Sequence, residues 1–190
     1  MSEILAPCGA QESLSAAVNA GADAVYLGEE YFSARKNADN FTAEQLCEAV
    51  RFCHYSGVKV YVTLNTLVFD REIPMLAKAI ENCAKADVDG FIVQDMGVAR
   101  LARQIVPELP LHASTQMTVN SPEGAVMAKK LGFTRVVLGR ELSFEQIKAI
   151  IDSCDIETEL FVHGALCVCV SGQCYMSSVL GGRSGNRGLC

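Results

Sequence analysis

The chain has 190 residues, of which half are hydrophobic and 20% are charged, and its formal net charge is −6. This composition is typical of a folded domain with a sizeable core and excludes a disordered chain. The negative charge argues against a broad basic surface for nucleic acid, although a local cluster or another domain can still supply RNA contacts. Trp is absent and aromatic residues make up 7%, so no stacking platform for single strands is evident.

The lengths of the apolar runs and the character of the first residues bear on whether the protein is secreted, membrane-bound or cytoplasmic. No apolar run approaches the roughly 18 residues of a membrane span. The opening residues MSEILAPCGA lack the basic and then apolar stretches of a secretory signal. We therefore expect a cytoplasmic protein whose thiols are kept reduced. Its nine cysteines are then core residues, metal ligands or reactive groups rather than disulfides.

Short apolar runs alternate with longer amphipathic segments along the chain. The short runs predict seven strands, which are nearly continuous in apolar residues, as strands buried on both faces are. These strands are Ile4–Ala6, Ala24–Leu27, Val58–Leu64, Gly90–Val93, Leu111–Ser114, Val136–Leu138 and Leu160–Val162.

Helical periods lie between the strands and carry clear start and stop signals. The apolar stripes are Leu46, Ala49, Val50 and Cys53; then Ile73, Leu76, Ala77, Ile80 and Ala84; then Phe144, Ile147, Ile150 and Ile151. The start signals are Thr42 with Gln45, Ser143 with Gln146, and Ser121 before Pro122. The stop signals are Gly21, Gly57 and Gly132.

Seven βα units fit either a (β/α)8 barrel short of its last unit or a doubly wound sheet. Polar residues directly follow the strands. In a barrel such positions converge at the C-terminal face, where active sites lie, whereas in an open sheet they spread along an edge. We therefore expect an α/β, TIM-barrel-like domain over residues 1–190, incomplete because the chain is a fragment whose C-terminal remainder is missing.

The strand-end side chains are candidates for ligand contact. If the strand period continues through LHASTQM, the side chains of His112, Ser114 and Gln116 share one face. They then bind a polar ligand or form a hydrogen-bonded layer inside the barrel. Asn65 and Asp95 fit a ligand contact and a buried turn or cap equally.

Arginines near the predicted barrel mouth are candidates for anion binding. Arg140 and Glu141 fit either a ligand site or an internal ion pair. Arg183 and Arg187 flank the cysteines near the end of the chain, where they hold an anionic group or lie in solvent.

The segment 163–190 is rich in cysteine and glycine. Cys167, Cys174 and Cys190 follow the spacing C-x6-C-x15-C, and the glycines permit close backbone approach. An iron–sulfur cluster requires thiolates and nearby backbone N–H groups. Zinc is the competitor, but structural zinc sites usually have C-x2–4-C pairs, and Cys167-x-Cys169 is too short. The third option is a thiol nucleophile with His163 or His112 as its base.

The other cysteines have a simpler interpretation. Cys47, Cys53, Cys83 and Cys154 fall in helical segments or at their ends, where we expect small buried hydrophobes. Cys8 follows the first strand and either joins the core or faces the site.

One stretch near the end of the chain resembles a known family. Its residues Glu159-x-Phe161-x-x-Gly164-Ala165-Leu166-Cys167-x4-Gly172-x-Cys174-x-Met176-Ser177 are similar to the signature of the peptidase U32 family. Further similar segments are ADAVYLG, VTLNT, IVQDMG, LHASTQM and GRSGNRGLC. These variants are most similar to the branch of the family that makes 5-hydroxycytidine in 23S ribosomal RNA. Related branches hydroxylate wobble uridine in transfer RNA or assist oxygen-independent hydroxylation in ubiquinone synthesis.

The resemblance implies a TIM-barrel-like fold and a [4Fe–4S] cluster. Cys167, Cys174 and Cys190 correspond to cluster ligands, and the fourth cysteine of the family lies beyond Cys190. Position 169 is a cysteine where the related hydroxylases have no thiol, so Cys169 is an alternative ligand or a buried small residue. The RNA-modifying branches are linked to prephenate as a hydroxyl source. The peptidase label comes from members described as collagenase-like proteases, with no agreed catalytic residues.

We therefore expect an iron–sulfur-dependent, oxygen-independent hydroxylase of ribosomal or transfer RNA. The candidate catalytic residues are His112, Gln116, Asp95 and His163. The candidate substrate-binding residues are Asn65, Arg140, Glu141, Arg183 and Arg187, with an arginine pairing a carboxylate such as that of prephenate. One alternative is a U32 peptidase that uses Cys167 and His163. Another is a non-catalytic iron–sulfur protein that works with a partner of the same family.

Overall fold

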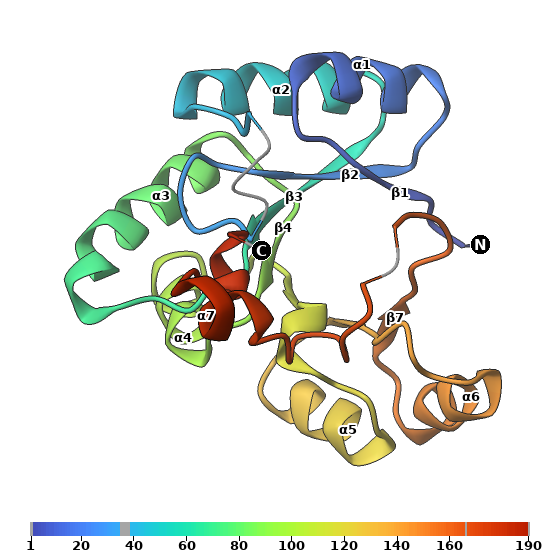
Figure 1. Cartoon of the computed structure of the whole chain (residues 1–190). Helices are drawn as coiled ribbons and strands as arrows, with labels where there is room; N and C mark the ends of the chain where they lie inside the picture. The colour runs from blue at the N-terminus through green and yellow to red at the C-terminus, as the bar shows by residue number, and fades with distance from the viewer. Residues whose placement is uncertain (1, 35–38, 166, 190) are drawn as a thin grey trace.

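The computed structural model describes residues 2–34, 39–165 and 167–189. Seven parallel strands form one sheet in which each strand pairs with the next along the chain (Figure 1). They are β1 (Leu5–Pro7), β2 (Ala24–Gly28), β3 (Lys59–Leu64), β4 (Gly90–Val93), β5 (Leu111–Ala113), β6 (Arg135–Val137) and β7 (Glu157–Glu159). This sequential order is that of a (β/α) barrel, because a doubly wound sheet reverses its strand order at a switch point. The predicted TIM-barrel-like α/β fold is confirmed.

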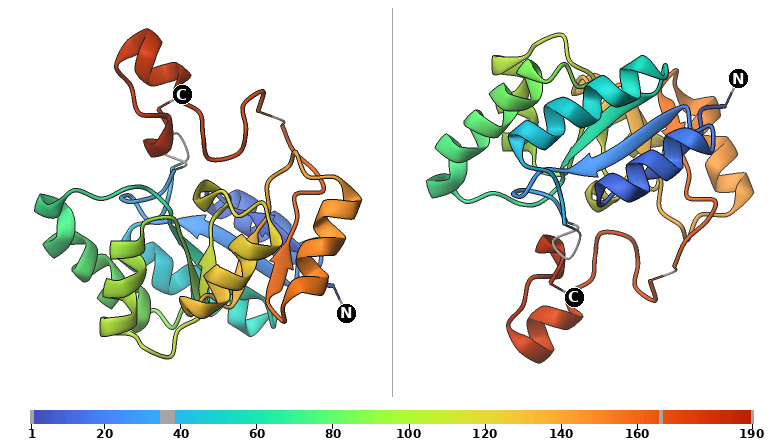
Figure 2. Two further views of the ribbon diagram at one scale, coloured as in Figure 1. Left: turned by 90° about the horizontal axis from the view of Figure 1, so that it is seen from below. Right: turned by 90° about the horizontal axis from the view of Figure 1, so that it is seen from above.

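Helices alternate with the strands and cover the outer face of the curled sheet (Figure 2). They are α1 (Gln11–Asn19), α2 (Ala43–Tyr55), α3 (Ile73–Lys85), α4 (Met96–Ile105), α5 (Pro122–Lys130) and α6 (Phe144–Ser153). The short turns η1 (Asp70–Glu72), η2 (Thr115–Met117) and η3 (Gly185–Arg187) are 3-10 helices, and α7 (Met176–Gly181) follows β7. The segment after β7, coloured red, lies off one end of the sheet instead of against its outer face (Figure 2).

The predicted helix boundaries rest on local hydrogen bonds. The Thr42 hydroxyl accepts a hydrogen bond from the Gln45 amide at 3.3 Å, and the Gln45 side chain accepts one from the Thr42 amide at 2.9 Å. Such a capping box satisfies two backbone donors at the helix start. Ser143 and Gln146 repeat it at α6, and Ser121 caps α5 ahead of Pro122. The predicted stops Gly21, Gly57 and Gly132 all have positive φ.

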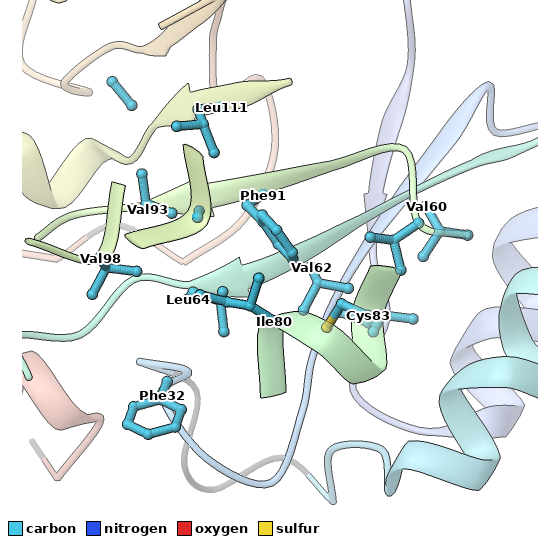
Figure 3. Close-up of a cluster of buried hydrophobic side chains, with 14 of the residues drawn as sticks. Phe32, Val60, Val62, Leu64, Ile80, Cys83, Phe91, Val93, Val98 and Leu111 are labelled. Carbon is cyan, nitrogen blue, oxygen red and sulfur yellow. The ribbon is translucent and has the colours of Figure 1, made fainter. Parts of the chain in front are cut away.

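The main core lies between the sheet and the helices. In β3 and β4 every second side chain points outward, and Val62, Leu64 and Phe91 pack against Ile80 and Cys83 of α3 (Figure 3). These side chains are fully buried, and each contributes roughly 1.5–3 kcal/mol when removed from water. Burial raises the pKa of the Cys83 thiol well above its usual value, so this cysteine is a packing residue.

The inner face of the sheet is smaller and more polar. Tyr61 packs there with Ala24 and Ile92, and Tyr26 lies beside this group. In the strand register His112 pairs with Ile92 on one side and Arg135 on the other. Ionisable side chains therefore replace part of the apolar layer that fills a typical barrel.

The sheet is not closed by strand pairing. Among the described residues β1 pairs only with β2, and β7 pairs only with β6. Side chains cross the interior instead: Arg135 Nη1 donates to Glu3 Oε1 at 2.9 Å, and Lys59 Nζ lies 2.9 Å from Glu3 Oε2. The N-terminal segment is thus tied to β3 and β6 by charge.

The predicted position of the seventh strand was wrong by three residues. The strand is Glu157–Glu159, and the apolar run Leu160–Val162 that predicted it is exposed. The cause is chemical, because Arg135 pairs with Glu157 and Glu159, and these carboxylates remove the apolar pattern from the true strand.

Two smaller expectations also fail. The β5 strand ends at Ala113 and continues into the turn η2, so His112, Ser114 and Gln116 do not share the face of one extended strand. Of the predicted apolar stripes, Phe144 and Ile151 of α6 are 88% and 49% exposed and Ile73 of α3 is 37% exposed, so these three residues lie outside the buried faces of their helices. None of the helices formed by the described residues has the length and apolar character that crossing a lipid bilayer requires.

Candidate functional site

A cavity of about 560 Å³ lies at the C-terminal ends of the strands. Its walls come from loops after several strands and from the segment 167–187, which runs over the barrel mouth. Active sites of (β/α) barrels occupy this face. The lining includes Tyr26, Thr63, Asn65, Phe69, Gln94, Gln116, Arg140, Glu159, Phe161, Cys167, Cys174, Tyr175, Asn186 and Arg187. The cavity therefore brings together many of the predicted residues.

Asn65 occupies the position directly after β3, on the cavity wall. Its side-chain oxygen accepts a hydrogen bond from the Ala34 amide at 2.9 Å. This contact fixes the carboxamide, since an oxygen that binds a backbone N–H leaves the side-chain NH2 as the donor for a ligand.

Gln94 and Gln116 meet an asparagine that sequence reasoning missed. The Asn186 NH2 group donates to the side-chain oxygens of Gln94 and Gln116, and the Asn186 oxygen accepts from the Leu67 amide at 2.9 Å. The Gln94 NH2 group donates to the Gln116 carbonyl at 3.4 Å. These glutamines therefore hold the segment over the barrel. The only sequence signal for Asn186 was its place in the GRSGNRG stretch.

Arg187 is bound by a carboxylate rather than left open for a ligand. Its Nη1 and Nη2 donate to the two Glu72 oxygens at 2.9 and 2.7 Å, and Nη2 also donates to the Leu67 carbonyl. The guanidinium stacks on the Phe69 ring at 4.9 Å. Hydrogen bonds from Arg187, and then from the Phe69 amide, lower the pKa of Glu72 to about 2.

Arg140 and Glu141 point to different partners. Arg140 is exposed and lines the cavity, and the described residues give its guanidinium no ion pair or hydrogen bond. Glu141 turns away and accepts hydrogen bonds from the Ser171 hydroxyl at 2.9 Å and amide at 3.1 Å. Burial opposes the Glu141 charge, but backbone and Ser171 hydrogen bonds outweigh it and lower its pKa. The internal Arg140–Glu141 ion pair, which was one of the two predicted alternatives, is therefore not formed among the described residues.

The cysteine segment places two predicted ligands on the cavity wall, namely Cys167 and Cys174. Cys169 lies beside them, and a hydrogen bond between its thiol and Cys174 raises the pKa of Cys169. Cys190 lies outside the described residues. Within the described ranges no three His, Cys, Asp or Glu side chains are grouped to hold a metal ion. Thiolates are the donors of iron–sulfur clusters, so the donor type on this wall fits such a cluster although three ligands are not assembled here.

Asp95 and His112 have structural surroundings. Asp95 caps α4 by accepting from the Gly97 amide at 2.7 Å, and it also accepts from the Val68 amide at 3.2 Å. His112 is not among the residues that line the cavity, and its ring is edge-on to Tyr61 at a centroid distance of 4.6 Å. Burial, helped by the charge of Arg135, lowers the pKa of His112 to about 3, so its imidazole is neutral.

His163 and Arg183 are exposed and do not line the cavity. No hydrogen bond joins His163 to Cys167 among the described residues. The structure thus groups Asn65, Gln116, Arg140 and Arg187 with the two cysteines, and it leaves Asp95, His112, Glu141, His163 and Arg183 outside the lining.

Relatives of known name cover nearly the whole chain. The chain is 44% identical to the 23S rRNA 5-hydroxycytidine C2501 synthase of Escherichia coli over 99% of its length, which is 28% of that protein. It is 39% identical to the tRNA hydroxylation protein P1 of Bacillus subtilis, with 99% of this chain and 44% of that protein covered. It is also 37% identical to a collagenase of Porphyromonas gingivalis, of which it covers 48%. The chain therefore spans less than half the length of these relatives.

Solved structures of similar shape support the fold. The U32 peptidase Mk0906 superposes with a TM-score of 0.72 at 19% identity, covering 84% of this chain and 68% of that one. A glycerophosphodiester phosphodiesterase from Agrobacterium tumefaciens gives a TM-score of 0.58 at 11% identity, covering 87% and 88% of the two chains. At these identities the likeness concerns the fold alone. The model of peptidase family U32 matches residues 9–190, and the chain belongs to this family.

Proposed function

We propose that this chain is the barrel domain of an enzyme that hydroxylates a nucleobase of ribosomal or transfer RNA without oxygen. The observation that carries the proposal is the cysteine segment seated across the cavity at the C-terminal face of the barrel. Relatives named as an rRNA hydroxycytidine synthase and as tRNA hydroxylation proteins support it. The proposal covers residues 1–190 as one domain acting in the cytoplasm.

The cysteine segment is the proposed cluster-binding part of this domain. Cys167, Cys174 and Cys190 would hold a [4Fe–4S] cluster together with a ligand outside these three. When bound, such a cluster supplies one-electron transfer beside the cavity. The glycines of the segment permit close backbone approach, which lets N–H groups face the sulfurs.

The cavity walls supply binding groups of three kinds. Arg140 offers a guanidinium without a partner, which suits the carboxylate of a co-substrate such as prephenate. Asn65 offers an oriented carboxamide. Tyr26, Phe161 and Tyr175 offer rings on which an unstacked base can lie. A base turned out of its stack is the form in which RNA-modifying enzymes reach their target atom.

RNA nucleoside analysis tests the proposal. The gene is deleted, and ribosomal and transfer RNA are digested and analysed by mass spectrometry for hydroxylated cytidine and uridine. We expect one hydroxylated nucleoside to disappear, the wild-type gene to restore it and Cys174→Ala not to restore it. Cys154→Ala, at a half-buried position at the C-terminal end of α6, serves as the matched control and should restore it. Unchanged nucleosides in the deletion strain would end the proposal.

Peptidase activity is the alternative, because relatives are named collagenase and uncharacterized protease. It requires a nucleophile, and Cys167 is the candidate. Among the described residues no hydrogen bond joins Cys167 to His163, and His163 does not line the cavity, which counts against a thiol–imidazole pair. Hydrolysis of gelatin by metal-free protein, abolished by Cys167→Ser and kept by Cys154→Ser, would favour the peptidase. A stable complex with another U32 protein, without turnover by this chain alone, would instead favour a non-catalytic partner.

A further inference from the structure

We propose that Glu72 is a positioning residue that seats the cysteine segment over the barrel mouth through Arg187. The two residues are 115 positions apart, and they belong to different parts of the fold. Glu72 ends η1, directly ahead of α3, whereas Arg187 ends η3 in the cysteine segment.

The contact has the geometry of a strong, oriented pair. Both guanidinium Nη atoms reach separate oxygens of Glu72 at 2.9 and 2.7 Å, which is the two-pronged arrangement that fixes direction as well as distance. The Phe69 ring lies under the guanidinium, and the Phe69 amide donates to Glu72 at 2.8 Å. The carboxylate is therefore held by its own turn before Arg187 binds it.

Asn186, the residue before Arg187, adds hydrogen bonds that hold the same part of the segment on the barrel. Asn186 accepts from the Leu67 amide at 2.9 Å and donates to Gln94 and Gln116 on the cavity wall. Arg187 donates a hydrogen bond to the Leu67 carbonyl at 2.9 Å, so both the N–H and the carbonyl group of Leu67 are hydrogen-bonded to the segment. Cys174 lies close to the same turn, since a Cβ on Gly185 would be 3.5 Å from the Cys174 carbonyl.

The charge of Glu72 holds the Glu72–Arg187 pair together at physiological pH. Its pKa of about 2 means that it is ionised throughout the physiological range. Other contacts of the segment, such as those of Ser171 with Glu141, are made to the loop after β6 and not to the loop after β3. Loss of the Glu72 charge should therefore free the end of the segment around η3 while the barrel and the Ser171 end stay in place.

Hydrogen exchange of the full-length protein tests the positioning role. In Glu72→Gln we expect the amides of Leu67 and of Gly188 and Leu189 to exchange roughly tenfold faster, as the loss of a charged hydrogen bond implies. Glu81→Gln is the matched control, since it removes an exposed ion pair with Lys78 from α3, the helix that directly follows Glu72, without touching the segment. Exchange in Glu72→Gln equal to that in Glu81→Gln would overturn the proposal.

A double-mutant cycle separates positioning from general damage. Arg187→Gln should give the same acceleration, and the double variant Glu72→Gln with Arg187→Gln should be no faster than either single variant. Arg187→Lys keeps the charge but loses the two-pronged contact, so it should fall between wild type and Arg187→Gln. Additive effects in the double variant would show that the two side chains act separately and would contradict the proposal.

A second readout rests on the proposed function, because it assumes the cluster. After anaerobic purification we expect Glu72→Gln to lose iron to a chelator several-fold faster than Glu81→Gln, followed by the visible absorption. If no variant binds iron but exchange still accelerates, the positioning role stands and the cluster fails. If iron is bound and its loss is unchanged in Glu72→Gln, the positioning role fails instead.

Discussion

Arg135 on β6 reaches Glu3 ahead of β1, with its Nη1 2.9 Å from Glu3 Oε1 although 132 positions separate the two residues. The same guanidinium binds Glu157 on β7 at 2.9 Å and lies 5.2 Å over the Tyr61 ring. One cation thus joins the N-terminal segment to the last strands. In a sheet whose strands β1 and β7 do not pair with each other, this cluster links the two sides of the opening.

Arg135→Met should destabilise the barrel strongly. The Arg135 side chain is 10% exposed, and its loss leaves Glu159 without its cation and Glu3 with Lys59 as its remaining partner. Removing one partner of a buried pair costs about 3–5 kcal/mol, and the partial exposure of Glu3 lowers our expectation to about 2–3 kcal/mol. Urea unfolding at pH 7 measures it.

Lys148→Met is the control for Arg135→Met, since Lys148 forms an exposed pair with Asp152 on α6. It should cost less than about 0.5 kcal/mol. Equal losses of unfolding free energy in the two variants would show that the Arg135 cluster stabilises the fold no more than an exposed ion pair does.

His112→Phe should change the pH dependence of stability. The folded protein keeps His112 neutral down to its pKa of about 3, whereas the unfolded chain takes up a proton below about 6.5. The unfolded state therefore binds more protons between these values, and the free energy of unfolding falls as the pH falls from 6.5 toward 3. Above pH 6.5 this contribution is constant. His112→Phe removes it, so the urea midpoint should fall less steeply between pH 6.5 and 4.5.

His163→Phe is the control, because His163 is exposed and should leave the wild-type slope unchanged. A slope in His112→Phe as steep as in wild type would contradict the burial effect. RNA hydroxylation by His112→Phe answers a separate question. Retention of the modification agrees with a position outside the cavity lining, and its loss in a folded variant would give His112 a chemical role.

The sequence predicted the strands well where the inner and outer positions are apolar. β4 was predicted at its observed bounds because Gly90–Val93 is buried on both faces. The prediction failed at β7, because this strand contains the charged residues Glu157 and Glu159. Their charges are compensated by Arg135, which lies 22 positions away from Glu157 in the sequence. A hydrophobic pattern along the sequence does not reveal a strand that is stabilised by ion pairs with a charged side chain on another strand.

The candidate site shows the same limit. Asn65, Gln116 and Arg140 were predictable because they follow strands, and barrel topology brings strand ends together. Glu72 and Asn186 were missed because their roles depend on contacts over 115 and 92 positions. No local pattern encodes such contacts. The meeting of Cys169 with Cys174 likewise follows from the path of the segment and not from the spacing.

Gly172→Ala should lift the cysteine segment from the barrel. Gly172 has a φ of +78°, and a Cβ there would lie 2.7 Å from Thr118 Oγ1 and 2.9 Å from the Gln116 carbonyl oxygen. The backbone carbonyl cannot retreat easily, so the segment must move. We expect faster hydrogen exchange over residues 167–176 and, if the proposed cluster is bound, faster iron loss from the purified protein.

Gly182→Ala separates backbone strain from close approach in this test. Gly182 also has a positive φ, +60°, but a Cβ there would meet no atom within 4 Å. Both substitutions carry a conformational cost of about 1 kcal/mol, yet only Gly172→Ala should disturb the docked segment. Identical hydrogen-exchange rates in the two variants would show that backbone strain at a positive φ, and not the close approach of the Cβ, causes the change.

Cys169→Ser and Cys174→Ser should differ in iron content. Cys174 is near enough to raise the pKa of Cys169, but of these two thiols only Cys174 lines the cavity with Cys167. If Cys174 is a cluster ligand and Cys169 is its neighbour, Cys174→Ser should lose nearly all iron and sulfide, whereas Cys169→Ser should retain both. Iron, sulfide and visible absorption per chain in anaerobically purified protein provide the measurement. The reverse result would make Cys169 the ligand, because a thiol that already contacts Cys174 needs little movement to take its place.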